Sequence, residues 1–167
     1  MSKGYSGLFQ KTAGAKIHNR HPLKMKAEVC LWAQSTANRL SAKSNNQRNK
    51  FNTACVVYDT STGKYYNGRN HGISIDHEKK NPVIFGDSTH KGLLPKESLN
   101  GYALGNCAEV HAINKALNDG ARLSNLVMYT IHTTKSSFGK SKPACKNCTH
   151  AFKGKINTNY TGWHEGE

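Results

Sequence analysis

The first periodic segment of the chain has the hydrophobic pattern of a helix. Its apolar positions recur every fourth residue and would form one stripe, made of Met25, Val29, Ala33, Ala37 and Leu40. Pro22 suits the first turn of such a helix, and the pattern fades near Ser41. We therefore predict a helix over residues 22–41, followed by a polar and basic loop over residues 42–50.

Two apolar segments rich in β-forming residues come next. Residues 51–58 and 64–69 flank the sequence Asp59-Thr-Ser-Thr-Gly63, which is typical of a turn, so they predict a β-hairpin. Residues 71–105 then show no clear period and contain two prolines and several glycines. Loops of this length are commonly functional, which makes this segment a candidate wall or lid for a site.

The second half of the chain alternates helix and strand patterns. We predict a helix capped by Asn106 and running to Asn118, a strand over 123–133, a basic loop over 134–142, a helix over 143–152 and a strand over 156–163. The full order is helix, strand, strand, helix, strand, helix, strand. This order favours an α/β fold with three layers, α/β/α.

The length of the chain indicates how many domains it forms, and its net charge indicates which kind of partner it binds. The chain has 167 residues, which fits one domain over residues 22–167 after a basic N-terminal segment of residues 1–21. Lys and Arg number 24 against 10 Asp and Glu, for a net charge of +14. Such an excess favours a polyanionic partner, and nucleic acid is the first candidate. No apolar run is long enough to span a bilayer and no signal peptide is visible, so no membrane partner is expected.

The five cysteines divide into two groups. Cys30 and Cys55 lie in apolar patterns and are expected in the core. Cys107, Cys145 and Cys148 are expected at two helix starts, with a spacing that suits three ligands of a zinc ion. A closed structural zinc site, with His111 or His150 as fourth ligand, is the alternative.

Glu109 favours a catalytic site over a structural one. It follows Cys107 by two residues, close to the expected metal without having to bind it. A carboxylate there could take a proton from the attacking water and deliver it first to a ring nitrogen and then to leaving ammonia. A cysteine and a glutamate two residues apart, followed by a Cys-x-x-Cys pair, are typical of zinc nucleobase deaminases.

Two motifs carry a resemblance to a known family. Gly105-Asn-Cys-Ala-Glu-Val110 and Pro143-Ala-Cys-Lys-Asn-Cys148 resemble the cytidine deaminase-like superfamily, and most closely the YwqJ-like deaminase domains of bacterial polymorphic toxins. The resemblance implies a cytidine deaminase-like fold with a mixed sheet flanked by helices. Cys107, Cys145 and Cys148 would then hold Zn²⁺ and Glu109 would shuttle protons. One departure is Ala144, which separates the proline from the first cysteine of the pair.

The resemblance also suggests substrate contacts. Asn70 resembles an asparagine that contacts the sugar, although it would equally suit a turn. Phe138 lies in the loop that touches the base in relatives, where it could stack on a base or anchor the loop to the core. Ala108, inside the Cys-Ala-Glu triplet, completes the expected substrate contacts.

The expected function is zinc-dependent deamination of a nucleobase, foremost cytosine to uracil in single- or double-stranded DNA, with RNA less favoured. The resemblance further implies the toxin module of a larger secreted protein, acting in the cytoplasm of a target cell and opposed by a cognate immunity protein. Two alternatives stay open. A free cytidine or nucleotide deaminase would not need the charge of +14. A non-catalytic, zinc-stabilised nucleic-acid-binding module would not need Glu109.

Overall fold

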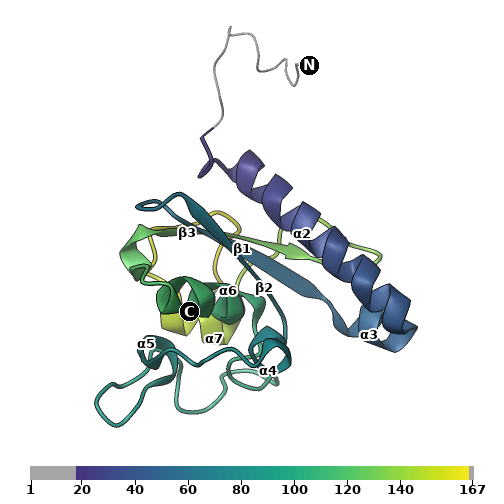
Figure 1. Ribbon diagram of the computed structural model, residues 1–167. Coiled ribbons are helices and arrows are strands. Elements are labelled where there is room, and N and C mark those ends of the chain that lie inside the picture. Colours follow the sequence, from purple (N-terminus) through teal and green to yellow (C-terminus); the bar gives the residue numbers. More distant parts are fainter. Residues whose placement is uncertain (1–17, 166–167) are drawn as a thin grey trace, which may run out of the picture.

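The computed structural model describes residues 18–165, which form a mixed sheet covered by helices on both faces (Figure 1). The strands are β1 (Thr53–Asp59), β2 (Lys64–Arg69), β3 (Leu126–His132) and β4 (Thr158–Asn159). The helices are α2 (Pro22–Lys43), α3 (Asn45–Lys50), α4 (Gly72–Asp76), α5 (Pro82–Phe85), α6 (Ala108–Asn118) and α7 (Lys146–Phe152), with a 3₁₀ turn η1 (Leu123–Asn125). The sheet order is β2-β1-β3-β4. Only the pairing of β3 with β4 is parallel. The predicted α/β class is confirmed.

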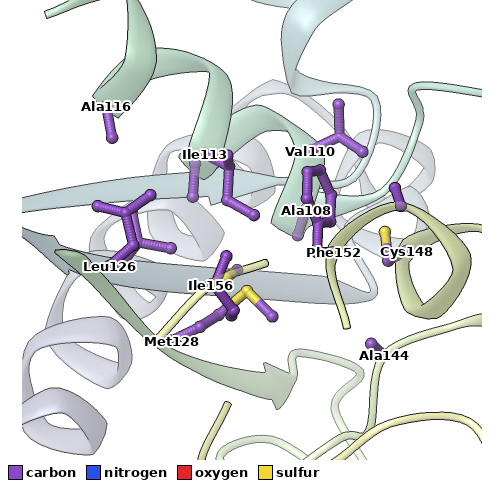
Figure 2. Close-up of a cluster of buried hydrophobic side chains, with 14 of the residues drawn as sticks. Ala108, Val110, Ile113, Ala116, Leu126, Met128, Ala144, Cys148, Phe152 and Ile156 are labelled. Carbon is purple, nitrogen blue, oxygen red and sulfur yellow. The ribbon is translucent and has the colours of Figure 1, made fainter. Parts of the chain in front are cut away.

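Alternation along the two central strands creates two cores. Ala54, Val56, Val127 and Ile131 pack toward the apolar stripe of α2. Cys55, Val57, Leu126 and Met128 pack on the other side, with side chains of α6 and α7 (Figure 2). Because both faces are buried, β1 and β3 read as nearly continuous apolar runs in the sequence.

The helix predicted from the stripe is present as α2, and its stripe residues are all buried. The loop predicted over residues 42–50 is wrong, because α2 continues to Lys43 and α3 follows at once. The Ser44 hydroxyl caps α3 by accepting the backbone N–H of Gln47 at 3.0 Å. The sequence of α3 has no hydrophobic period, because its buried residue is Arg48 and not an apolar side chain. The Arg48 guanidinium donates to the Thr133 carbonyl at 2.9 Å.

Other boundaries also differ from the predictions. The N-cap of α6 is Cys107 and not the predicted Asn106, and the segment 71–105 contains the short helices α4 and α5. The segment predicted as one strand over 123–133 begins with η1, so β3 covers only its later part. The helix predicted from Pro143 begins at Lys146, with Cys145 as its N-cap. The last predicted strand shrinks to β4, because the Asn159 side chain accepts the backbone N–H of Thr161 and turns the chain. Residues 1–17 of the predicted basic segment lie outside the described residues.

None of the helices within residues 18–165 combines the length and the apolar character needed to cross a bilayer.

Gly68 allows β2 to pack closely on α6. A Cβ at this position would clash with the backbone N of Ala112 and would lie 2.6 Å from the carbonyl oxygen of Ala108. Backbone atoms of a helix cannot move aside as a flexible side chain can. We predict that Gly68→Ala destabilises the fold by about 1–3 kcal/mol or more, measured by urea unfolding.

Gly101→Ala is the matched control for this substitution, since nothing lies within 4 Å of the added Cβ. Because α6 carries Cys107 and Glu109 at its start, Gly68→Ala should also weaken metal binding. Equal unfolding free energies for the two variants would contradict the close packing of β2 on α6.

Candidate metal centre

Three thiols converge between the starts of α6 and α7. Cys107 is the N-cap of α6, Cys145 is the N-cap of α7, and Cys148 lies in the first turn of α7. Their sulfur atoms all lie within 4.8 Å of one another. The Cys107 and Cys145 sulfurs are 3.1 Å apart. The three cysteines could therefore hold a metal ion.

The cluster is arranged to favour a thiolate at Cys145. Hydrogen bonds from the Cys107 and Cys148 thiols, joined by the backbone N–H groups of Cys148 and Asn147, hold the pKa of the Cys145 thiol well below its ordinary value. A donor thiol that ionised would lose its hydrogen bond to Cys145 and place a second negative charge beside the first, so the pKa values of Cys107 and Cys148 are raised. One anionic sulfur surrounded by donors is a natural starting point for cation binding.

Glu109 is buried beside the thiols in the first turn of α6, with 3% of its surface exposed. Burial, together with the charge of Cys145, raises the pKa of this carboxyl to about 7, while Lys142 and the Thr130 hydroxyl oppose the shift. Glu109 does not belong to the metal-binding group, which consists of the three thiols. It is therefore placed to hold and release a proton next to the cluster.

A pocket of about 210 Å³ opens beside the cluster. Its walls come from four segments that are distant in sequence, and its lining residues are Asn52, Thr53, Asn70, His71, Tyr102, Asn106, Cys107, Ala108, Glu109, Lys142, Pro143 and Cys145. Two of the three thiols and the candidate proton carrier thus face the same space. Cys148 is fully buried behind them.

Lys142 brings a positive charge into this pocket. Its backbone N–H donates to the Thr130 carbonyl at 2.9 Å, which fixes the residue alongside β3. Its ammonium donates to the Thr53 hydroxyl. The Lys142 side chain is half-buried and close enough to Glu109 to stabilise the carboxylate.

Two of the three residues expected to contact substrate line the pocket, namely Asn70 and Ala108. The side-chain oxygen of Asn70, Oδ1, accepts hydrogen bonds from the backbone N–H groups of Asn52 and Thr53. Its side-chain nitrogen, Nδ2, donates to the Lys50 carbonyl at 2.7 Å. A side-chain amide carries two N–H groups, so one donor is left over for another partner. These hydrogen bonds span 17 to 20 residues, so the Asn70 side chain fixes the segment before β1 rather than its own turn, and it leaves one N–H for a second role.

Phe138 is not brought to the pocket. It is half-buried in the core on the α2 side of the sheet. The loop around it folds back on β3, where the Gly139 N–H donates to the His132 carbonyl and the His132 N–H to that of Lys140. This packing fits the loop-anchor alternative and does not fit a stacking platform at the pocket.

Tyr102 is the pocket aromatic that sequence reasoning missed. It lines the pocket and is 69% exposed. Its segment is tied to the metal cluster by Asn147, which accepts the Leu99 N–H at 2.8 Å and donates to the Ser98 hydroxyl at 3.1 Å. Asn147 stands between the two cysteines of the pair, and this position is the signal that could have linked the two regions.

Neither histidine considered as a fourth ligand joins the thiols among residues 18–165. The His111 Nδ1 accepts the Arg69 backbone N–H at 3.0 Å, and its Nε2 lies 3.2 Å from an Asp76 carboxylate oxygen. Burial lowers the pKa of His111 to about 4, so the ring is neutral and ties β2 and α4 to α6. His150 is exposed.

Comparisons with models of known protein families, with curated proteins and with solved structures find no match for this chain.

Proposed function

We propose that this chain is a zinc-dependent deaminase of nucleobases in nucleic acid, acting foremost on cytosine in DNA. One observation carries the proposal. Two of three clustered thiols at two helix starts border the same pocket as a buried carboxyl that lies outside the cluster. A ligand set and a separate proton carrier are the two parts that hydrolytic deamination needs.

The donor set fits zinc. Thiolates are strong ligands for Zn²⁺, and three sulfurs bound to one tetrahedral zinc lie about 3.8 Å from one another. The cluster, with its sulfurs within 4.8 Å, has this scale. Three protein ligands leave one position for water or substrate, as in catalytic zinc sites.

The reaction adds water to the ring carbon that carries the amino group and releases ammonia, so cytosine becomes uracil. Zinc, when bound by Cys107, Cys145 and Cys148, would supply a Lewis acid that activates water. Glu109 would accept the proton from water and pass it to the adjacent ring nitrogen. It would then take the second proton from the hydroxyl that water has added to the ring carbon and deliver it to the departing amino group, which leaves as ammonia while the carbonyl of uracil forms. The spare N–H of Asn70 would orient the nucleotide in the pocket.

Charge favours a polynucleotide substrate, either single- or double-stranded DNA or, less favoured, RNA. The chain carries a net charge of +14, and Lys142 places part of it in the pocket. A free cytidine needs no such field. The two motifs also support a role as the toxin module of a larger secreted protein, acting in the cytoplasm of a target cell and bound by a cognate immunity protein.

The alternative of a structural zinc in a nucleic-acid-binding module is less well supported. A closed site needs a fourth protein ligand, and none of the histidines or carboxylates in residues 18–165 joins the thiols. Such a module would also gain nothing from burying Glu109 at the edge of a pocket, since burying a carboxyl costs stability.

The proposal is tested by incubating the zinc-loaded protein with single-stranded DNA, duplex DNA and RNA of the same sequence. Sequencing of the products should reveal C-to-T changes in DNA. A-to-G changes would move the proposal to adenine, whereas unchanged bases in all three substrates would refute deamination of nucleic acid.

Tyr102 is predicted to stack on a base at the pocket mouth. Stacking of a base on an aromatic ring contributes about 1–3 kcal/mol, so Tyr102→Ala should weaken deamination of an oligonucleotide by about 5- to 150-fold in kcat/KM. Tyr102→Phe retains the ring and should retain the rate. Leu31→Ala, which removes an exposed apolar side chain from α2, is the control. Parent-like activity of Tyr102→Ala would exclude the stacking role.

A further inference from the structure

A second cavity of about 570 Å³ adjoins the metal-site pocket. It is lined by Gln47, Lys50, Asn52, Arg69, His71 and Ile75. Asn52 and His71 line both cavities, so they form the boundary between them. A ligand that fills the metal-site pocket could therefore extend into the second cavity.

Arg69 gives this cavity a buried positive charge that forms no ion pair among the described residues. Only 6% of its surface is exposed, and its Nε has no hydrogen-bond partner. Its guanidinium stacks on the Phe51 ring, 5.2 Å from the centroid. Asp76 is close enough for its negative charge to favour the guanidinium, but burial outweighs this effect and lowers the pKa of Arg69.

A buried guanidinium that forms no ion pair is costly, since the charge loses water without a carboxylate bound directly to it. It is also the side chain best suited to bind phosphate, because its planar N–H groups match two phosphate oxygens. Lys50 adds an exposed ammonium on the same cavity wall.

The boundary itself has an unusual backbone. His71 adopts a left-handed conformation, with φ of 62°, although it is not glycine. Its N–H donates to the Asn106 carbonyl at 2.8 Å, which ties this turn to the residue before Cys107. Strain of this kind persists where surrounding contacts hold it, and it is common at ligand sites.

We propose that the second cavity binds a backbone phosphate of the substrate strand, next to the nucleotide in the metal-site pocket, with Arg69 as the principal ligand and Lys50 as the second. This inference rests on the proposed function and deepens it, since it defines the substrate as a polynucleotide. Phosphate contacts fix the register of a strand without reading its sequence. Here they would hold the target base over Glu109.

The test measures binding alone, so that it does not depend on deamination. Single-stranded oligothymidylate and oligouridylate contain phosphodiesters but no cytosine, and their affinity is measured by fluorescence anisotropy across a salt series. For single strands, log affinity falls with log salt by about 0.7 per neutralised phosphate. Arg69→Gln and Lys50→Gln should each reduce this slope by about 0.7 and weaken binding to both oligonucleotides.

Arg122→Gln is the matched control. Arg122 is an exposed arginine at the N-cap of η1, and its substitution removes one positive charge, as Arg69→Gln does. Its slope should equal that of the parent. Arg69 packs on Phe51, so the folding of Arg69→Gln is checked by thermal unfolding, while exposed Lys50 offers a variant free of this concern. A parent-like slope for Lys50→Gln and for folded Arg69→Gln would overturn the phosphate site. Reduced slopes in a protein that deaminates no substrate would support the phosphate site and refute the deaminase.

Discussion

Replacing Glu109 with glutamine is expected to lower the rate of cytosine deamination by about 10²- to 10⁴-fold, the usual contribution of a positioned acid–base group. Glutamine keeps the size of the side chain but can neither accept nor deliver the proton. Because Glu109 lies outside the thiol group, the variant should bind metal as the parent does. Its fold should also persist, since an amide avoids burying a charge in this position.

The measurement is ammonia release from a cytosine-containing oligonucleotide, together with metal content per chain. Glu97→Gln is the matched control, because Glu97 is exposed and lines neither cavity. Activity of Glu109→Gln within a few-fold of the parent would remove Glu109 from the mechanism. Loss of metal in the same variant would instead make Glu109 a ligand.

Cys145→Ala is expected to have the second large effect, a combined loss of metal, activity and stability. Its sulfur is the one that accepts hydrogen bonds from the other two thiols, so the cluster loses its central acceptor. A metal present at about 1,000 times its Kd stabilises the folded state by about 4 kcal/mol, and that contribution disappears with the site. Adding a chelator to the parent should lower its Tm in the same way.

Cys30→Ala makes the same chemical change in α2, outside the thiol cluster, and should keep the metal. Metal content is measured on the purified proteins and Tm by thermal unfolding with and without added zinc. A Cys145→Ala protein that still responds to zinc as the parent does would show that the three thiols are not the binding site.

Local signals in the sequence predicted the parts of the site that depend on short spacings. The Cys-Ala-Glu triplet and the Cys-Lys-Asn-Cys tetrad lie at helix starts, so their geometry follows from a few residues of backbone. The sequence also predicts α2, since the one buried face of this helix produces a clear period of apolar residues. In contrast, the polar sequence of α3 predicts a loop, because capping by Ser44 and burial of Arg48 leave no hydrophobic period.

The substrate side of the site depends on how distant segments meet, and local patterns do not contain this information. Phe138 looked suitable because its loop precedes the cysteine pair, yet the loop folds onto the α2 side of the sheet. Tyr102 reaches the pocket because Asn147 holds its segment by contacts across more than forty residues of sequence. Arg69 stands out only once its burial and lack of an ion pair are known.

We propose that the pocket deaminates cytosine within a nucleic-acid strand. The most direct test is to measure kcat/KM of the zinc-loaded protein on an oligonucleotide with a single cytosine and on free cytidine. Contacts to flanking nucleotides should position the target base, so the oligonucleotide is predicted to react far faster, in kcat as well as in affinity. Equal values or a preference for cytidine would contradict this account and indicate a nucleoside deaminase, and an absence of reaction with both would contradict deamination altogether.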